Sequence, residues 1–66
     1  MLFSAIIHKE DNIYVAECTE VGTVSQGNTI EEAIENLKES TELFLEEFPI
    51  VKPYKTYLTS FELEYA

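Results

Sequence analysis

The chain begins with two short, mostly apolar runs, Leu2 to His8 and Ile13 to Cys18. Both runs are rich in β-branched or aromatic residues, and the polar residues Lys9 to Asn12 lie between them, which is typical of a β-hairpin. A third short strand is expected at about Thr23 to Gln26, after a turn at Thr19 to Gly22. The pattern therefore predicts an antiparallel three-stranded meander.

One face of this meander should form the core. Side chains alternate between the two faces of a strand, and both registers open to the hairpin place the same six residues together. They are Phe3, Ala5, Ile7, Tyr14, Ala16 and Cys18. We expect Cys18 to be a small core residue and His8, on the other face, to be an ordinary surface histidine.

The period of the pattern then changes to that of a helix. Gly27 and Asn28 favour a turn, and Thr29 followed by Glu32 has the spacing of a capping box, so the helix should begin at Ile30. The expected buried stripe recurs at helical spacing and consists of Ile30, Ala33, Ile34, Leu37, Thr41, Phe44, Leu45 and Phe48. Pro49 should end the helix.

A strand-like pattern follows a linker from Ile50 to Lys55. Tyr57, Thr59, Phe61, Leu63 and Tyr65 alternate with Leu58, Ser60, Glu62 and Glu64, which predicts a fourth strand. The order βββαβ predicts a single α+β domain over residues 1–66, with one helix layer on one sheet layer. The fourth strand should return parallel to an earlier strand by a right-handed connection.

Charge narrows the classes of partner. Thirteen acidic residues against four basic ones give a net charge of −9, which opposes direct binding to nucleic acid, because that binding depends on Lys and Arg. The same charge favours a basic protein partner, since complementary fields accelerate encounter. Solubility alone is the simpler explanation.

The glutamates of the helix form an acidic ridge, which we define as Glu31, Glu35, Glu39, Glu42 and Glu46. At about 100° per residue these five positions fall within about 80° of arc, opposite the apolar stripe. The ridge is either a solvated face or a docking surface for a basic partner. Leu43, on the polar side of the helix, favours docking, so the candidate interface is Glu35, Glu39, Glu42, Leu43 and Glu46.

The sheet face that the helix does not cover is half apolar. Ile6, Ile13, Val15 and Leu58 are expected there among polar residues, and they are the candidates for self-association. A homo-oligomer, a dimer or larger, would bury them, whereas simple exposure is the alternative. The fourth strand could also be an unpaired edge that is open to strand addition.

No catalytic, cofactor-binding or metal-binding residues are predicted. His8 and Cys18 lie on opposite faces of the predicted sheet, and no triad spacing or phosphate-binding glycine loop is found. Cys18 is the only cysteine, which excludes an intramolecular disulfide. Because no catalytic constellation is found, we expect that the protein is not an enzyme. Neither a signal peptide nor a membrane span is recognisable, so we expect a soluble, cytoplasmic protein.

The run Tyr14-Val15-Ala16-Glu17-Cys18, then Gly22, then Ser25-Gln26-Gly27-Asn28-Thr29-Ile30-Glu31-Glu32-Ala33 and Leu37 resembles the N-terminal domain of the HicB family of antitoxins. The resemblance covers about Ile13 to Phe48, and Leu58 to Leu63 is similar to the last strand of short, single-domain members. It implies a partial ribonuclease-H-like fold in the order βββαβ.

The resemblance also implies a function. HicB-like proteins bind and neutralise HicA toxins, which are small basic ribonucleases that cut messenger RNA. Many of them carry a C-terminal DNA-binding domain, which is not expected here because the sequence stops at Ala66. In ribonuclease H enzymes the metal-binding carboxylates begin in the middle of the first strand. This chain has Ser4, Ala5 and Ile6 there, so nuclease activity is not implied. An interaction module without a toxin partner is the alternative function.

Overall fold

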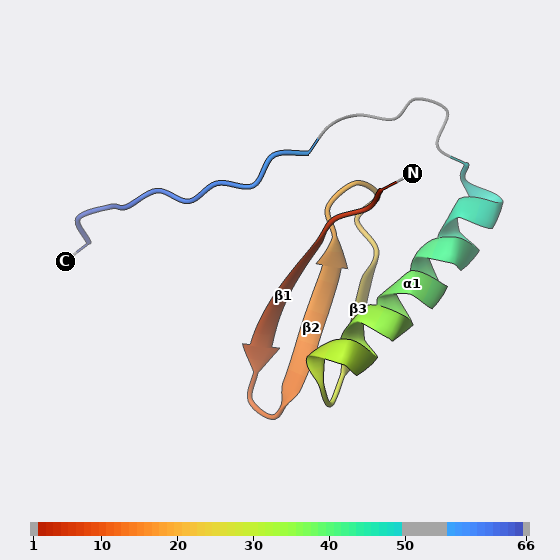
Figure 1. Cartoon of the computed structure of the whole chain (residues 1–66), viewed down its shortest axis with the longest axis horizontal. Coiled ribbons are helices and arrows are strands. Elements are labelled where there is room, and N and C mark those ends of the chain that lie inside the picture. Colours follow the sequence, from red (N-terminus) through yellow and green to blue (C-terminus); the bar gives the residue numbers. More distant parts are fainter. Residues whose placement is uncertain (1, 50–55, 66) are drawn as a thin grey trace.

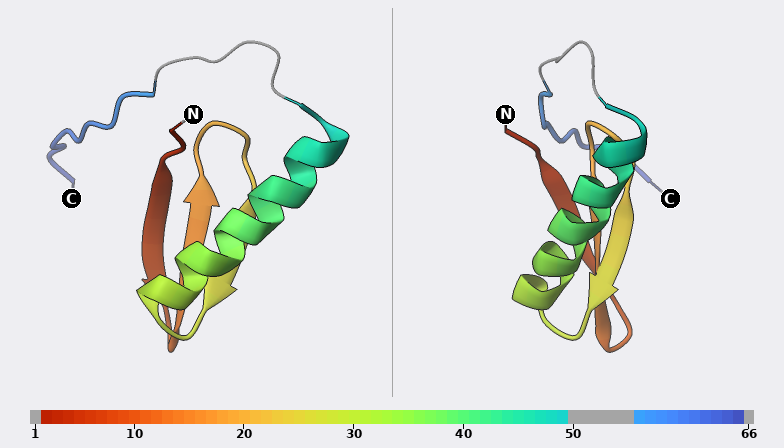
Figure 2. Two further views of the ribbon diagram at one scale, coloured as in Figure 1. Left: turned by 45° about the vertical axis from the view of Figure 1, so that its right-hand side comes forward. Right: turned by 90° about the vertical axis from the view of Figure 1, so that its right-hand side faces the viewer.

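The computed structural model of the chain describes residues 2–49 and 56–65. Its elements are β1 (Ala5–Glu10), β2 (Ile13–Cys18), β3 (Val24–Gly27) and α1 (Ile30–Glu47). The three strands form an antiparallel sheet in the order β1-β2-β3, and α1 runs diagonally across one face of it (Figures 1 and 2). The predicted α+β architecture, a meander followed by one helix, is confirmed.

The hairpin between β1 and β2 is tighter than expected. Glu10 pairs with Ile13, so only Asp11 and Asn12 form the turn, and Asp11 takes a positive φ of 52° that Asp and Asn tolerate better than most residues. The register pairs Ala5 with Cys18 and Ile7 with Ala16. The predicted core face is therefore confirmed for Phe3, Ile7, Tyr14, Ala16 and Cys18, whereas Ala5 is exposed.

The start of the helix follows the capping prediction. The Glu32 N–H donates to the Thr29 Oγ1 at 3.0 Å, and the Asn28 N–H donates to the Glu32 Oε1 at 3.0 Å. The reciprocal bond thus reaches the residue before the cap rather than the cap itself. At the other end, the Phe48 N–H donates to the Phe44 carbonyl, and Pro49 follows immediately.

The helix packs on β2 and β3 through two kinds of contact. Ala33 and Leu37 are buried against Ala16 and Cys18 and form the apolar core. Toward β3 the contacts are polar: the hydroxyls of Thr23 and Thr41 lie 2.7 Å apart, those of Ser25 and Ser40 lie 2.8 Å apart, and the Asn36 Nδ2 donates to the Gln26 carbonyl at 2.8 Å. These bonds hold α1 toward the β3 side of the sheet.

The predicted apolar stripe is buried only in part. Ala33, Leu37 and Thr41 are buried, but Ile30, Phe44 and Phe48 are exposed. The aromatic rings of Phe44 and Phe48 contact each other, with centroids 5.1 Å apart. The exposure of Phe44 and Phe48 has a geometric reason, because the diagonal course of α1 carries its last turn beyond the sheet (Figure 2).

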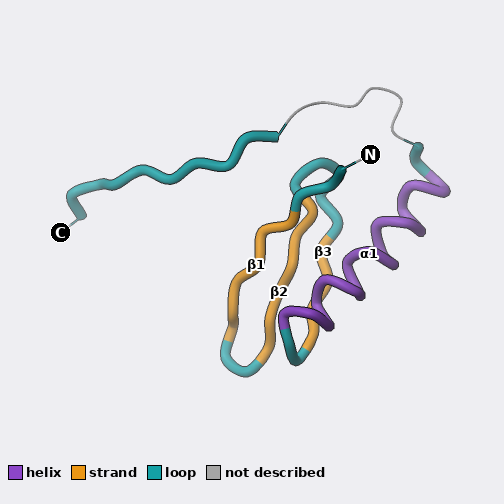
Figure 3. The backbone as a smooth tube through the Cα atoms, viewed as in Figure 1, coloured by secondary structure: helices purple, strands orange, loops and turns teal. Residues whose placement is uncertain are grey.

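The predicted fourth strand does not form in this structure. Residues 56–65 form no strand and run away from the sheet (Figure 3). A strand needs a neighbour to satisfy its backbone N–H and C=O groups, and in the described part of the chain β1 has only β2 beside it. The linker predicted from Ile50 to Lys55 lies outside the described residues.

Gly27 is required by a close approach rather than by a turn. Its φ is not positive, whereas that of Gly22 is 82°. A Cβ on Gly27 would lie 2.6 Å from the Ala33 backbone nitrogen and 2.9 Å from the Glu32 carbonyl carbon. The first turn of α1 therefore sits directly on the last residue of β3.

We predict that Gly27→Ala lowers the free energy of unfolding by about 1–3 kcal/mol, because the helix backbone must move away from β3. Chemical denaturation followed by circular dichroism measures the loss. Gly22→Asn is the control: the position is open, and Asn tolerates a positive φ, so its stability should stay within about 0.5 kcal/mol of wild type. Equal losses in the two variants would contradict the close-approach explanation.

Candidate protein-interaction surfaces

The acidic ridge is present as predicted. All five of its glutamates are exposed, and α1 contains seven glutamates but one lysine, Lys38, for a net helix charge of −6. Lys38 forms an exposed ion pair with Glu35, with 3.4 Å between Nζ and Oε1. An exposed pair of this kind contributes at most about 1 kcal/mol. The ridge therefore remains strongly negative.

Leu43 and Glu42 mark the two sides of this ridge. Leu43 is 58% exposed and lies one helical turn from both Glu39 and Glu46 on the side that faces β3. Glu42 lies on the opposite side, at the rim of a cleft between α1 and β1. The five candidate interface residues are thus brought onto one exposed surface, with an apolar side chain at its border.

The open sheet face carries apolar side chains on all three strands, with Val24 of β3 56% exposed. Ile13 and Val15 are half-buried there, and Ile6 on β1 is 45% exposed. Val15 lies between His8 and Gln26 in the register. The prediction that Leu58 joins this face is wrong, because residues 56–65 do not enter the sheet in this structure.

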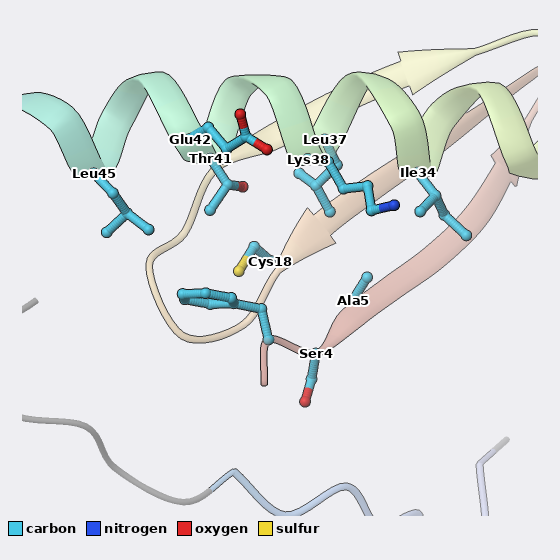
Figure 4. Close-up of a pocket in the computed structure, with 10 residues that line it drawn as sticks. Ser4, Ala5, Cys18, Ile34, Leu37, Lys38, Thr41, Glu42 and Leu45 are labelled. Carbon is cyan, nitrogen blue, oxygen red and sulfur yellow. The ribbon is translucent and has the colours of Figure 1, made fainter. Parts of the chain in front are cut away.

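The cleft between α1 and the start of β1 was not predicted. It has a volume of about 400 Å³, and its lining residues are Phe3, Ser4, Ala5, Cys18, Ile34, Leu37, Lys38, Thr41, Glu42 and Leu45. Figure 4 shows Leu37, Thr41 and Ile34 projecting from α1 toward Cys18 and Ala5. The cleft exists because α1 covers β2 and β3 and leaves the inner face of β1 open.

A buried glutamate beside this cleft was also missed. Glu20 lies in the turn between β2 and β3, and its Oε1 accepts a hydrogen bond from the Ser4 N–H at 2.7 Å and from the Cys18 thiol at 3.6 Å. The Ser4 N–H stabilises the charged form and lowers the pKa of Glu20 from 4.5 to about 2. This carboxylate ties the start of β1 to the turn.

Sequence reasoning could not find Glu20 because its partner is a backbone N–H sixteen positions away. The neighbouring Thr19 N–H donates to the Ser4 carbonyl at 3.0 Å, so both backbone groups of Ser4 are bound by this turn. Gly22, with its positive φ, allows the turn to close.

The histidine and cysteine are placed as predicted. His8 is exposed, with its Nε2 3.6 Å from the Glu10 Oε2, and Cys18 is buried. The register puts them on opposite faces of the sheet. Within residues 2–49 and 56–65 no group of three His, Cys, Asp or Glu side chains could hold a metal ion. No helix among those residues could span a membrane.

Fold and surfaces together define a small α+β protein with an acidic helix and an open sheet edge. Comparison with known proteins shows that the chain is similar to a UPF0150 protein from Helicobacter pylori (strain J99), with 48% identity over 46 residues. The match covers 68% of this chain but 64% of that relative, and its name specifies no ligand or activity. No family model matches the chain, and no solved structure matches it.

We predict that Glu20→Gln makes the protein less stable at neutral pH but not at strongly acidic pH. A lowered folded-state pKa adds stability that is fully present above pH 4.5 and is lost as the pH falls through about 2. The difference in unfolding free energy from wild type should therefore shrink between these values. Denaturation curves recorded at several pH values measure it.

Glu17→Gln is the matched control, because it removes the same charge from an exposed position on β2. A pH-dependent difference from wild type as large as that of Glu20→Gln would show that the Ser4 contact is not the cause.

Proposed function

We propose that this protein is a non-catalytic antitoxin-like protein that binds and neutralises a small basic ribonuclease of the HicA type. The resemblance of residues 13–48 to HicB-like antitoxins suggests the partner, and the exposed acidic ridge on α1 supports it. Neutralisation would occur by protein contact that covers the toxin's RNA-binding surface.

The acidic ridge is the observation that carries this proposal. Like charges at i, i+3 and i, i+4 cost about 0.2–0.5 kcal/mol per pair, and Glu46 and Glu47 also lie at the negative end of the helix dipole with no basic residue in the last turn. A helix that only needed a polar face could carry lysines among these glutamates. A basic partner would turn the repulsion into attraction.

A toxin that cuts messenger RNA must itself present a basic surface to the phosphates. The exposed carboxylates of the acidic ridge lie along α1. They would compete with the RNA phosphates for this basic surface, because both are attracted to it by their negative charge. Leu43, exposed at the border of the ridge, would supply the apolar contact that anchors such an interface, because exposed charge pairs at a rim add little affinity.

The alternative function, a self-assembling interaction module without a toxin, is favoured by a different observation. Several large apolar residues of the described chain are exposed, among them Phe48, Phe61 and Tyr65. An isolated monomer of 66 residues gains nothing from this arrangement.

The proposal is tested by co-expressing the protein with any small basic protein that is encoded next to it, and by measuring RNA cleavage by that protein alone and in the complex. A stable complex in which cleavage is suppressed is the expected result. A neighbour that cuts RNA unimpeded in the presence of this protein, or that does not bind it, would refute the antitoxin function and leave the alternative.

We predict that neutralising Glu35, Glu39, Glu42 and Glu46 together to glutamine slows association with the toxin about 10-fold or more at low salt. The change removes four of the nine net negative charges, from −9 to −5, and the rate should also become less dependent on salt. Stopped-flow measurements from low to physiological ionic strength measure both effects.

The control variant carries the same change in net charge at four exposed glutamates outside the helix, namely Glu10, Glu17, Glu62 and Glu64. It should associate faster than the ridge variant. Equal rates for the two variants would mean that only the total charge matters and that the ridge is not the docking surface.

A further inference from the structure

We propose that residues 57–65 form the missing fourth strand in a second copy of the chain, by pairing with the outer edge of that copy's β1 and closing its cleft. The result is a dimer with two exchanged arms. This inference concerns self-assembly and does not depend on the proposed antitoxin function.

The acceptor is the outer edge of β1. The Thr19 N–H donates to the Ser4 carbonyl at 3.0 Å, which makes Ser4 and Thr19 a hydrogen-bonded pair. By the alternation of antiparallel ladders, the backbone groups of Ala5, Ile7 and Lys9 then point away from β2. No strand of the described chain meets them, so this edge can accept another strand.

The cleft lies beside this edge and reaches the core residues Cys18 and Leu37. Ala5 is exposed although it shares a sheet face with the buried Ala16 and Cys18, because α1 does not reach across β1. The apolar side chains of Phe3, Ile34, Leu37 and Leu45 line the cleft beside it. A strand added to β1 would place every second side chain over this space.

The donor is the extended segment 57–65. Tyr57 is 81% exposed, Phe61 is 82% exposed and Tyr65 is 92% exposed, and all three lie on the same side of a strand together with Leu63. At about 3.3 Å per residue the segment is about 30 Å long, which exceeds the about 20 Å of the six-residue β1. Its pattern is that of a strand with one buried face.

A second copy is the occupant that the geometry favours. The segment runs away from its own sheet in the views of Figures 1 and 2. The radius of gyration is 13.8 Å, against about 11 Å for a compact chain of this length. Reciprocal exchange under two-fold symmetry satisfies both β1 edges and both arms at once.

The area is sufficient for a stable dimer. A buried aromatic side chain removes about 150–250 Å² from water. Three aromatic residues on each of two arms therefore supply about 900–1,500 Å², which reaches the size class of specific protein interfaces at about 1,200–2,000 Å².

The first test compares two variants of the full chain by light scattering and analytical ultracentrifugation. Phe61→Lys places a charge on the side of the arm that enters the cleft, and it should raise the dimer dissociation constant about 30-fold or more. Ser60→Lys adds the same charge on the opposite side of the arm and should leave the dimer close to wild type. A monomeric wild type, or equal effects of the two substitutions, would overturn the proposal.

The second test distinguishes exchange from other dimers. Ala5→Pro removes an N–H that points away from β2, so it should block the acceptor edge while the hairpin folds. Phe61→Lys and Ala5→Pro should each be monomeric alone, but their equimolar mixture should give a one-to-one heterodimer in native mass spectrometry, because one copy retains an edge and the other an arm. If circular dichroism shows that Ala5→Pro is unfolded, Ala5→Glu takes its place.

Two results of the second test would contradict strand exchange. A mixture that stays monomeric would mean that the arm does not bind a second copy. If instead Val15→Lys on the open sheet face separates the copies while Phe61→Lys does not, the dimer forms through that face and the arm has no part in it.

Discussion

A single helix cannot cover a three-stranded sheet, and the position that α1 takes on the sheet decides the rest of this structure. A helix is about 10 Å wide and strands lie about 4.8 Å apart, so α1 can cover about two strands. Only Asn28 and Thr29 separate β3 from α1, and Gly27 allows the first helical turn to lie against β3. The helix therefore covers β3 and β2, and the inner face of β1 remains open.

Because α1 lies over β3 and β2, its contacts with the two strands differ. Toward β3, hydroxyl and amide groups form hydrogen bonds, whereas the centre over β2 is apolar and small, with Ala16, Cys18, Ala33 and Leu37. Such a core buries few large side chains. A domain of this size with so small a core gains stability from any further burial, which gives self-association a physical reason.

Glu20 compensates in part for the exposed position of β1. The start of this strand has no helix above it, and the carboxylate binds the Ser4 N–H while the Thr19 N–H binds the Ser4 carbonyl. The two bonds hold Phe3 and Ser4 at the mouth of the cleft, so the acceptor edge that we propose for a second copy keeps a defined shape in the monomer. The acidic ridge lies on the outer side of α1, and of its five glutamates Glu42 also lines the cleft.

Local patterns in the sequence determined most of the fold. Short β-prone runs and turn residues placed the three strands within a few residues, and the period of two along a strand identified their inner face. The Thr29 and Glu32 spacing located the first residue of α1. These signals arise from neighbours along the chain. The exposure of the acidic ridge followed from helical periodicity in the same way. Only the tertiary structure decided which strand α1 leaves uncovered, where the cleft lies, how Glu20 is bound, and that residues 56–65 do not join their own sheet. Those features depend on contacts between residues far apart in the sequence, and on the width of one helix against three strands, which no local pattern records.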